Sequence, residues 1–197
     1  MVADTTSVNR QRAAPRDGDG LWLFGYGSLL FKADFPYHEH RPARIEGWAR
    51  RFWQGSHDHR GTPEAPGRVA TLVERPGVSC TGMAYRIPVD ALGPLDFREK
   101  NGYLRFRTEM AFLDADERAE GLVYIATERN PAFLGPAPVD EMAEQIAACH
   151  GPSGPNRTYL LELARALRAL GDPDPHVLEL EAAVERKCAA TAGRGLV

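Results

Sequence analysis

The sequence predicts an α+β fold: a six-stranded mixed sheet, closed or nearly closed as a barrel, with helices around it and a helical C-terminal third. Two observations carry this prediction. Strand-like segments fill the first two-thirds of the 197-residue chain, and helical patterns are confined to the last third, a segregation typical of α+β domains. We expect one domain over residues 20–197, since domains commonly hold ~100–200 residues. Residues 1–19 are polar and without periodicity, so we expect a disordered arm there.

The first expected strand is a short apolar run that ends in glycines. The clearest strand covers residues 103–113, where apolar residues such as Leu104 alternate with charged ones such as Arg105. This two-residue period indicates a half-buried strand with the arginine on its polar face. The dipeptide Pro76-Gly77 is expected to separate two further strands. The expected strands cover residues 21–24, 45–53, 69–73, 78–87, 103–113 and 122–126.

Three helices are expected in the last third, each with a start or stop signal. Met142 and Ile146 have helical spacing ahead of a glycine. Asn156 is expected to cap a second helix that carries a leucine-rich stripe. Asp174 followed by Pro175 predicts the start of the third helix, because a capping carboxylate then precedes a proline in the first turn.

Charge and composition exclude several classes of partner. The net charge is −3 and no basic stripe is evident, so nucleic acid is not an expected partner. The densest basic stretch holds Arg41, Arg44, Arg50 and Arg51, and we interpret it as a solvated strand face. No apolar run approaches the ~18–20 residues that span a bilayer, and no secretory signal is evident, so no membrane partner is expected. Three widely spaced cysteines fit a reducing, cytoplasmic compartment.

Histidines occur as two close pairs, His38 with His40 and His57 with His59. Residues two apart share one face of a strand, so either pair is able to coordinate a metal ion. Both pairs lie in loop-rich segments, and no third or fourth ligand stands at a characteristic spacing. We therefore expect no metal and no other cofactor, and a metal-dependent hydrolase is a less favoured alternative.

The segment Gly25-Tyr26-Gly27-Ser28-Leu29 directly follows the first expected strand. Its glycines allow backbone N–H groups to converge, and such a nest binds an anion. The segment lacks the additional glycine of a dinucleotide fingerprint and the lysine of a P-loop, so nucleotide binding is not supported. Ser28 also lacks the flanking glycines of a nucleophile elbow. An anion site and a simple bend at the end of a strand both remain open.

Together, the motifs resemble those of the ChaC family of glutathione-specific γ-glutamylcyclotransferases, over about residues 21–185. Residues 24–29 are similar to the family's opening signature. Residues 95–99, with residues 102–103, are similar to the block that holds its catalytic glutamate. Three departures stand out. Residues 90–94 look shorter than usual and carry Gly93-Pro94 where a charged helical turn is expected, Asn101 stands where a glycine is common, and the first twenty residues have no counterpart. Further similar blocks cover residues 51–56, 58–61, 66–69, 71–74, 130–131, 134–137, 151–154 and 159–160.

The resemblance implies a γ-glutamylcyclotransferase-like domain that cleaves glutathione into 5-oxoproline and cysteinylglycine without a cofactor. It also implies that Glu99 is the catalytic residue and that glutathione is the partner. Cyclotransfer on other γ-glutamyl amino acids or amines is an alternative, and so is a binding domain without turnover. The residues that the resemblance suggests for substrate binding are Phe24, Gly25, Tyr26, Gly27, Ser28, Leu29, Arg51, Gln54 and Tyr159.

The implied chemistry needs one base. The substrate's α-amine attacks its own γ-carbonyl, and well-oriented intramolecular reactions reach effective molarities of about 10⁵–10⁸ M. The amine titrates near ~8 and a free glutamate near ~4.3, so a base at Glu99 calls for burial that raises its pKa toward ~6–7. We therefore expect Glu99 without a salt bridge, with Arg98 and Lys100 pointing elsewhere.

Overall fold

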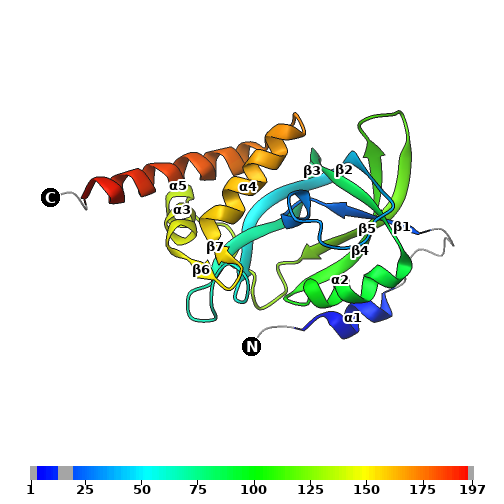
Figure 1. Cartoon of the computed structure of the whole chain (residues 1–197), viewed down its shortest axis with the longest axis horizontal. Helices are drawn as coiled ribbons and strands as arrows, with labels where there is room; N and C mark the ends of the chain where they lie inside the picture. Colours follow the sequence, from blue (N-terminus) through cyan, green and yellow to red (C-terminus); the bar gives the residue numbers. More distant parts are fainter. Residues whose placement is uncertain (1–3, 13–19, 195–197) are drawn as a thin grey trace. The chain divides into compact units, whose positions relative to one another are not determined.

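A computed structural model describes residues 4–12 and 20–194, the last four of them as backbone only. Its strands are β1 (Leu21–Gly25), β2 (Glu39–Ser56), β3 (Gly67–Ile87), β4 (Tyr103–Phe112) and β5 (Arg118–Ala126). These five form a closed barrel in the order β1-β3-β2-β4-β5 (Figure 1). The sheet is mixed, because β1 pairs antiparallel with β3 and parallel with β5, and the second pairing closes the barrel. The predicted α+β class and barrel closure are confirmed.

The barrel has five strands rather than six, because the two strands expected at residues 69–73 and 78–87 are one. Strand β3 continues through Pro76-Gly77, where both residues are exposed and the glycine has φ +82°. A proline or glycine at an exposed point of a strand bends it or introduces a bulge without ending it. The dipeptide therefore marks a bend within a strand and not a break between two strands.

The chain divides into two compact units. The first unit holds residues 1–50 and 71–132, and with them β1, β4, β5 and most of β2 and β3. The second unit holds residues 51–70 and 133–197, and with them the remaining parts of β2 and β3. Each unit is described separately below, and a single domain over residues 20–197 stays a prediction.

Short helices complete the first unit: α1 (Thr6–Gln11), η1 (Ser28–Leu30), η2 (Val89–Ala91) and α2 (Leu92–Arg98). Helix α2 is anchored by Leu92 and Leu95, which belong to a buried cluster that includes Leu23 of β1 and Tyr124 of β5. Pro94 does not interrupt α2, because the N–H groups of a first turn have no partner within the helix. The helical turn therefore persists despite the Gly-Pro sequence.

Residues 4–12 are ordered and not part of a disordered arm. Helix α1 lies beside α2 at one end of the barrel (Figure 1), and Asn9 within α1 is fully buried. The segment is held mainly by polar contacts with backbone groups of other elements, and a search for apolar periodicity does not detect such contacts. Residues 1–3 and 13–19 of the predicted arm lie outside the described residues.

Arg105 lies on a covered face of β4, although the alternation predicts a polar, solvated face. Its side chain is only 4% exposed. The guanidinium donates to the backbone carbonyls of Asn9 and, at 3.0 Å, of Arg12. Helix α1 therefore covers this face of the strand.

The second unit contains α3 (Val139–Ala148), α4 (Asn156–Ala169) and α5 (Pro175–Arg194), as well as a small hairpin of β6 (His150–Gly151) and β7 (Gly154–Pro155). The three predicted helices are confirmed. Asp174 caps α5 by accepting a bond from the N–H of His176 at 3.0 Å. Asn156 is the first residue of α4 and not its cap, because its buried side chain pairs with both backbone groups of Arg68 at 2.7 and 2.8 Å.

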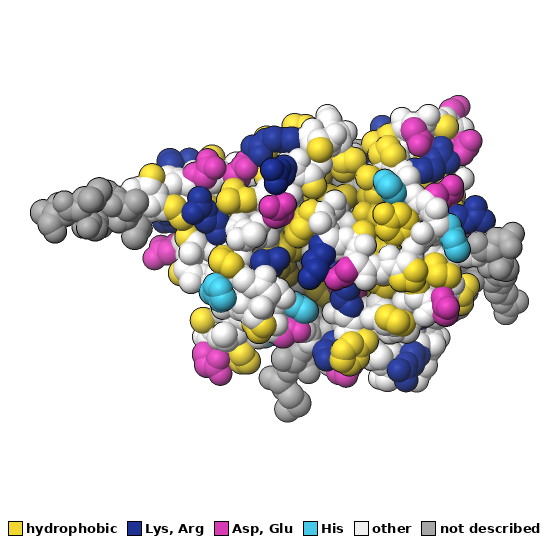
Figure 2. Space-filling view, in the orientation of Figure 1, with side chains coloured by type: hydrophobic (Ala, Val, Ile, Leu, Met, Phe, Trp, Pro, Cys, Tyr) yellow, Lys and Arg dark blue, Asp and Glu magenta, His cyan; other side chains and the backbone are white. Residues whose placement is uncertain are grey.

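Charged side chains of both signs are interspersed on the face of the molecule drawn in Figure 2. Within the predicted basic stretch, Arg41 pairs with Asp114 at 2.7 Å and Arg44 pairs with Glu46 at 3.3 Å. Arg50 departs from the interpretation of a solvated face, since it is only 2% exposed. Among the helices of the described residues, none is both long and apolar enough to cross a membrane.

Candidate active site

Glu99 occupies the position directly after α2, where the chain turns back into β4. Its N–H donates to the carbonyl of Leu95 at 2.9 Å, and its own carbonyl accepts from the N–H of Tyr103 at 3.3 Å. The turn needs Gly102, whose φ is +89° and where a Cβ atom would lie 2.6 Å from the Asn130 side chain. The Glu99 side chain is 16% exposed, so the fold holds this carboxylate in a largely covered position.

Arg98 joins Glu99 to the turn that follows β1. Its Nε lies 3.3 Å from Oε1 of Glu99. Its Nη2 donates to Oγ of Ser28 at 3.2 Å and to the carbonyl of Lys32 at 3.3 Å, and its Nη1 pairs with Asp34. The structure thus brings two predicted site segments together, although they are 70 residues apart in the chain.

The prediction of Glu99 without a salt bridge is wrong, because Arg98 pairs with it. Arg98 is the last residue of α2 and Glu99 directly follows it. The Arg98 guanidinium contacts Glu99 through Nε and Asp34 through Nη1. Lys100 does point elsewhere, since its Nζ lies over the ring of Phe97 at 3.9 Å from the centroid.

The predicted anion-binding turn is tightly built. A Cβ atom at Gly25 would lie 2.7 Å from Cβ of Leu29 and 3.3 Å from the ring of Tyr85, so only glycine lets the chain fold back here. Beyond it, η1 begins at Ser28, and the N–H of Leu30 donates to the carbonyl of Gly27 at 3.0 Å. The first N–H groups of a helical turn have no partner inside it, which is consistent with the predicted nest.

Tyr26 is buried, and its hydroxyl donates to the carbonyl of Tyr124 at 2.7 Å. This bond supports β5, and a contact of Tyr26 with substrate stays a prediction. The carbonyl of Tyr26 accepts from Nε of Arg50 at 2.7 Å, and Nη2 of the same arginine donates to Thr81 at 2.5 Å. Sequence patterns missed Arg50 as a support of the turn, because a lone arginine in a strand looks like a surface charge.

A buried polar network supports α2 from the barrel side. The hydroxyl of Tyr124 donates to Asp96 at 2.7 Å, and Nε of Arg105 lies 3.4 Å from the same carboxylate. Burial, together with the bond to Asp96, raises the pKa of Tyr124 well above its ordinary value, so the hydroxyl stays protonated. Tyr85 supports the turn in a similar way, donating to the carbonyl of Leu29 at 2.6 Å. Its burial raises its pKa to about 12.

Three of the predicted substrate-binding residues lie in the second unit. Gln54 is fully buried and pairs with Phe133 in an isolated antiparallel bridge. Tyr159 is buried, its hydroxyl accepts from the N–H of Ala70 at 3.2 Å, and Arg51 is half-buried. The contacts described for Gln54 and Tyr159 serve the fold of this unit, and the role of all three residues toward substrate stays a prediction.

Among the described residues, no three His, Cys, Asp or Glu side chains are grouped as a metal ion requires. His59 is paired through Nδ1 with Oγ of Ser153 at 3.0 Å. His40 lies beside the ring of Tyr37, with 5.5 Å between the ring centroids. For these two histidines the described contacts are structural.

Comparisons with known proteins connect these features to one family. Residues 21–187 match the family model described as ChaC-like protein. The Arabidopsis thaliana protein named gamma-glutamylcyclotransferase 2-3 is 46% identical over 174 residues, which cover 81% of this chain and 86% of the relative. The Homo sapiens glutathione-specific gamma-glutamylcyclotransferase 1 is 42% identical over 179 residues, covering 85% and 81%.

Solved structures agree with the sequence matches. A crystal structure of the yeast gamma-glutamyl cyclotransferase specific to glutathione superposes with a TM-score of 0.80 at 32% identity, covering 86% of this chain and 97% of the yeast chain. A second structure, named gamma-glutamyl cyclotransferase, has a TM-score of 0.54 at 18% identity and covers 83% and 87%. That second likeness concerns the fold alone.

Proposed function

This chain belongs to the ChaC-like protein family, and from that premise we propose that it cleaves glutathione into 5-oxoproline and cysteinylglycine. The observation that carries the proposal is the junction made by Arg98. Through this residue the largely covered carboxylate of Glu99 and the glycine-rich turn after β1 are held together. A base and an anion-binding turn side by side are what closure of a γ-glutamyl group requires.

The reaction is an internal displacement. The α-amine nitrogen of the glutamyl group bonds to the γ-carbonyl carbon, and the amide bond to the cysteine nitrogen breaks. Glu99 takes a proton from the attacking amine and returns it to the departing amine, so the step needs no water and no oxidant. Because both reacting groups belong to one substrate, most of the acceleration comes from holding it folded.

The turn after β1 supplies the second function. Backbone N–H groups of Gly27, Ser28 and Leu29 are proposed to bind the α-carboxylate or the oxyanion that develops on the γ-carbonyl. Phe24, Gly25 and Tyr26 shape the turn, since each is buried or tightly packed in the fold. The α-carboxylate would then place the amine toward Glu99.

The other predicted contacts remain part of this proposal. Arg51, Gln54 and Tyr159 belong to the second unit, and their contact with substrate stays a prediction. The described cysteines Cys80, Cys149 and Cys188 form no disulfide. Reduced thiols and a glutathione substrate both fit a cytoplasmic location.

The test is the variant Glu99→Gln, which keeps the shape of the side chain and removes the base. Purified protein is incubated with glutathione, and 5-oxoproline is measured by mass spectrometry. We expect kcat to fall about 10²–10⁴-fold, the usual contribution of a general base. The matched control is Glu109→Gln, which removes an exposed carboxylate paired with Arg118 and should leave kcat unchanged.

Two outcomes contradict the proposal. A Glu99→Gln variant as fast as wild type would exclude Glu99 as the base. Release of free glutamate in place of 5-oxoproline, lost on treatment with EDTA, would indicate a metal-dependent hydrolase.

Substrate range is tested in the same assay. The name of the Arabidopsis thaliana relative does not restrict the γ-glutamyl substrate, whereas that of the Homo sapiens relative specifies glutathione. We expect glutathione to be cleaved with the higher kcat/KM when it is compared with γ-glutamyl amino acids. A preference for the latter would favour the broader activity.

A further inference from the structure

The segment from residue 4 to residue 12, named here the N-terminal strap, lies outside the 21–187 match to the family model. It nevertheless contacts the loop that carries Glu99. The N–H of Thr5 donates to the carbonyl of Lys100 at 2.9 Å, and Asp4 forms an isolated antiparallel bridge with Asn101. The strap is thus added to this loop like a short extra strand.

The side chain of Thr5 strengthens this attachment. Its hydroxyl lies 2.8 Å from the carbonyl of Tyr103 and 3.0 Å from that of Lys100, and Thr5 is only 8% exposed. The carbonyl of Glu99 itself lies 3.5 Å from the same oxygen. One buried hydroxyl therefore faces three carbonyl groups, those of Glu99, Lys100 and Tyr103, around the turn that carries the proposed base.

Asn9 makes a second attachment one turn further along α1. Its Nδ2 donates to the carbonyl of Tyr103 at 3.0 Å, and its Oδ1 accepts from the N–H of Arg105 at 2.9 Å. The amide side chain thereby pairs with β4 as a backbone group would. Arg12 completes the contact, with its guanidinium 4.6 Å from the ring centroid of Phe106.

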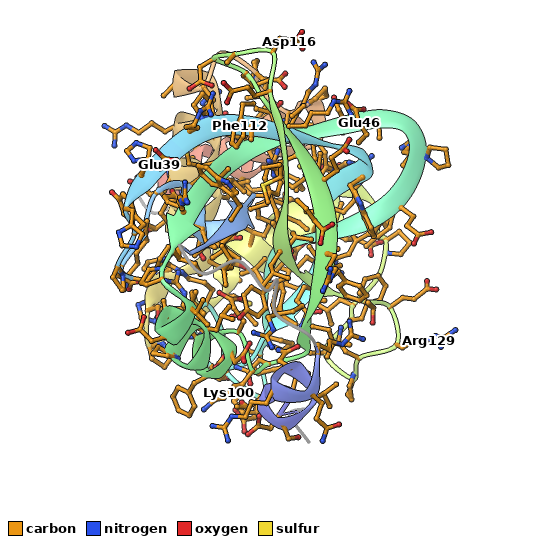
Figure 3. All side chains as sticks on the ribbon, turned by 90° about the vertical axis from the view of Figure 1, so that its right-hand side faces the viewer. Glu39, Glu46, Lys100, Phe112, Asp116 and Arg129 are labelled. Carbon is orange, nitrogen blue, oxygen red and sulfur yellow. The ribbon has the colours of Figure 1, made fainter. Side chains whose placement is uncertain are left out.

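The strap also completes the network behind α2. At the C-terminal end of α1 the carbonyl of Asn9 accepts from the N–H of Arg12 at 3.0 Å, and carbonyl groups at such an end carry partial negative charge. Those of Asn9 and Arg12 accept from the guanidinium of Arg105, whose Nε lies 3.4 Å from Asp96 within α2. Figure 3 shows the labelled Lys100 at the end of the barrel where α1 and α2 lie.

We propose that the N-terminal strap positions Glu99 for catalysis, and that Thr5 and Asn9 are its positioning residues. The inference rests on the proposed function, because it takes Glu99 as the base. Glu99 follows the last residue of α2, so the backbone of the loop sets where its carboxylate stands. Loss of geometry of about 1 Å at a reacting group costs up to ~10²-fold in rate.

The experiment compares three variants of the full chain with wild type. Thr5→Val removes the hydroxyl and keeps the shape, Thr5→Ser keeps the hydroxyl, and Ser7→Ala removes an exposed hydroxyl from the same strap. We expect kcat for 5-oxoproline formation to fall roughly 10-fold in Thr5→Val, with little change in KM. Thr5→Ser and Ser7→Ala should keep kcat within about twofold of wild type.

The pH profile of kcat/KM distinguishes a positioning role of Thr5 from a purely structural one. Loss of folded enzyme lowers kcat/KM equally at every pH, whereas a displaced base also moves the acid-side midpoint of kcat/KM. Thr5→Val is expected to move that midpoint, and Thr5→Ser to restore it. An unchanged kcat and midpoint in Thr5→Val would overturn the proposal.

Two further measurements cover the remaining outcomes. If Thr5→Val does not fold, Asp4→Ala loosens the strap instead, because Asp4 accepts from the N–H of Thr6 at 2.9 Å and is exposed. Wild-type rates in that variant would equally overturn the inference.

If wild type forms no 5-oxoproline, the proposed function fails. In that case hydrogen exchange still tests the attachment of the strap to the loop that carries Glu99. Faster exchange of the backbone N–H groups of Gly102 and Tyr103 in Thr5→Val supports this attachment, and unchanged exchange refutes it.

Discussion

Arg50 illustrates what decides the role of a single charged residue in this protein. It stands in an arginine-rich part of the sequence, yet it is one of the largest fully buried side chains. Its guanidinium bonds the carbonyls of Tyr26 and Thr81 and so holds the turn of the candidate site from behind. The planar fork of arginine suits two acceptors at once, which lysine cannot copy.

Replacing Arg50 with methionine is expected to destabilise the fold and reduce activity. The substitution keeps much of the apolar stem but removes two charge-assisted hydrogen bonds to buried carbonyls, each worth about 1.5–3 kcal/mol. Urea unfolding followed by circular dichroism measures the loss. Arg44→Met is the matched control in the same strand, because Arg44 is half exposed and pairs only at the surface with Glu46. Equal stability of the two variants would contradict the supporting role of Arg50.

The roles of Arg98 and Arg105 are likewise set by residues that lie near them in space and not by their neighbours in the sequence alone. In the sequence Arg98 is followed by Glu99 and Lys100, and Arg105 stands between Leu104 and Phe106. In the structure Arg98 links Glu99 to Ser28, and Arg105 bridges α1 and Asp96. Periodicity assigns a residue to a face, but it carries no information on which element covers that face.

At the scale of elements, close packing around Gly25 restricts which residue fits in the turn after β1. Gly25 is the point where β1 ends and the chain folds back over Leu29 and Tyr85. Gly25→Ala places a Cβ atom 2.7 Å from Cβ of Leu29, which lies next to the backbone and cannot swing away. We expect a loss of about 1–3 kcal/mol in the free energy of unfolding and a large fall in 5-oxoproline formation.

The control for this substitution is Gly93→Ala in α2. A Cβ atom at Gly93 meets nothing within 4 Å, and alanine is favoured over glycine inside a helix by about 0.5–1 kcal/mol. Gly93→Ala should therefore unfold at a slightly higher temperature and keep its activity. A Gly25→Ala variant with wild-type stability and rate would show that the turn is not constrained as the structure indicates.

At the scale of the whole molecule, buried tyrosines make stability depend on alkaline pH. Burial, and secondarily the neighbouring Tyr37, raises the pKa of Tyr85 to about 12, from an ordinary value of 10.0. The folded state thus keeps this proton at pH values where the unfolded chain loses it. The contribution to stability is complete below pH ~10 and is lost as the pH rises through about 12.

We expect the free energy of unfolding to fall between about pH 9 and about pH 11.5, as measured by denaturant titrations. Tyr124 adds a change of the same sign, because its pKa is also raised. Tyr85→Phe should make the dependence on pH less steep, since one of the linked protons is removed. A slope identical to that of wild type would mean that Tyr85 titrates alike in the folded and unfolded states.

The sequence by itself determined the elements and the chemistry to look for. Apolar periodicity placed the strands of the barrel and the three C-terminal helices, because burial of one face repeats at fixed spacing. Caps such as Asp174 were recognisable because they act over two or three residues. Glu99 and the turn at residues 25–29 stood out through local motifs, and the resemblance those motifs carried gave the family.

Only the tertiary structure decided how these parts meet. Four features depend on groups far away in the chain: continuation of β3 through Pro76-Gly77, burial of Arg50, the contact of Arg98 with Ser28 and the helix within residues 4–12. Thr5 contacts Lys100 across 95 residues. Such contacts leave no local pattern, because a hydrogen bond is defined by the position of its two atoms and not by their separation in sequence.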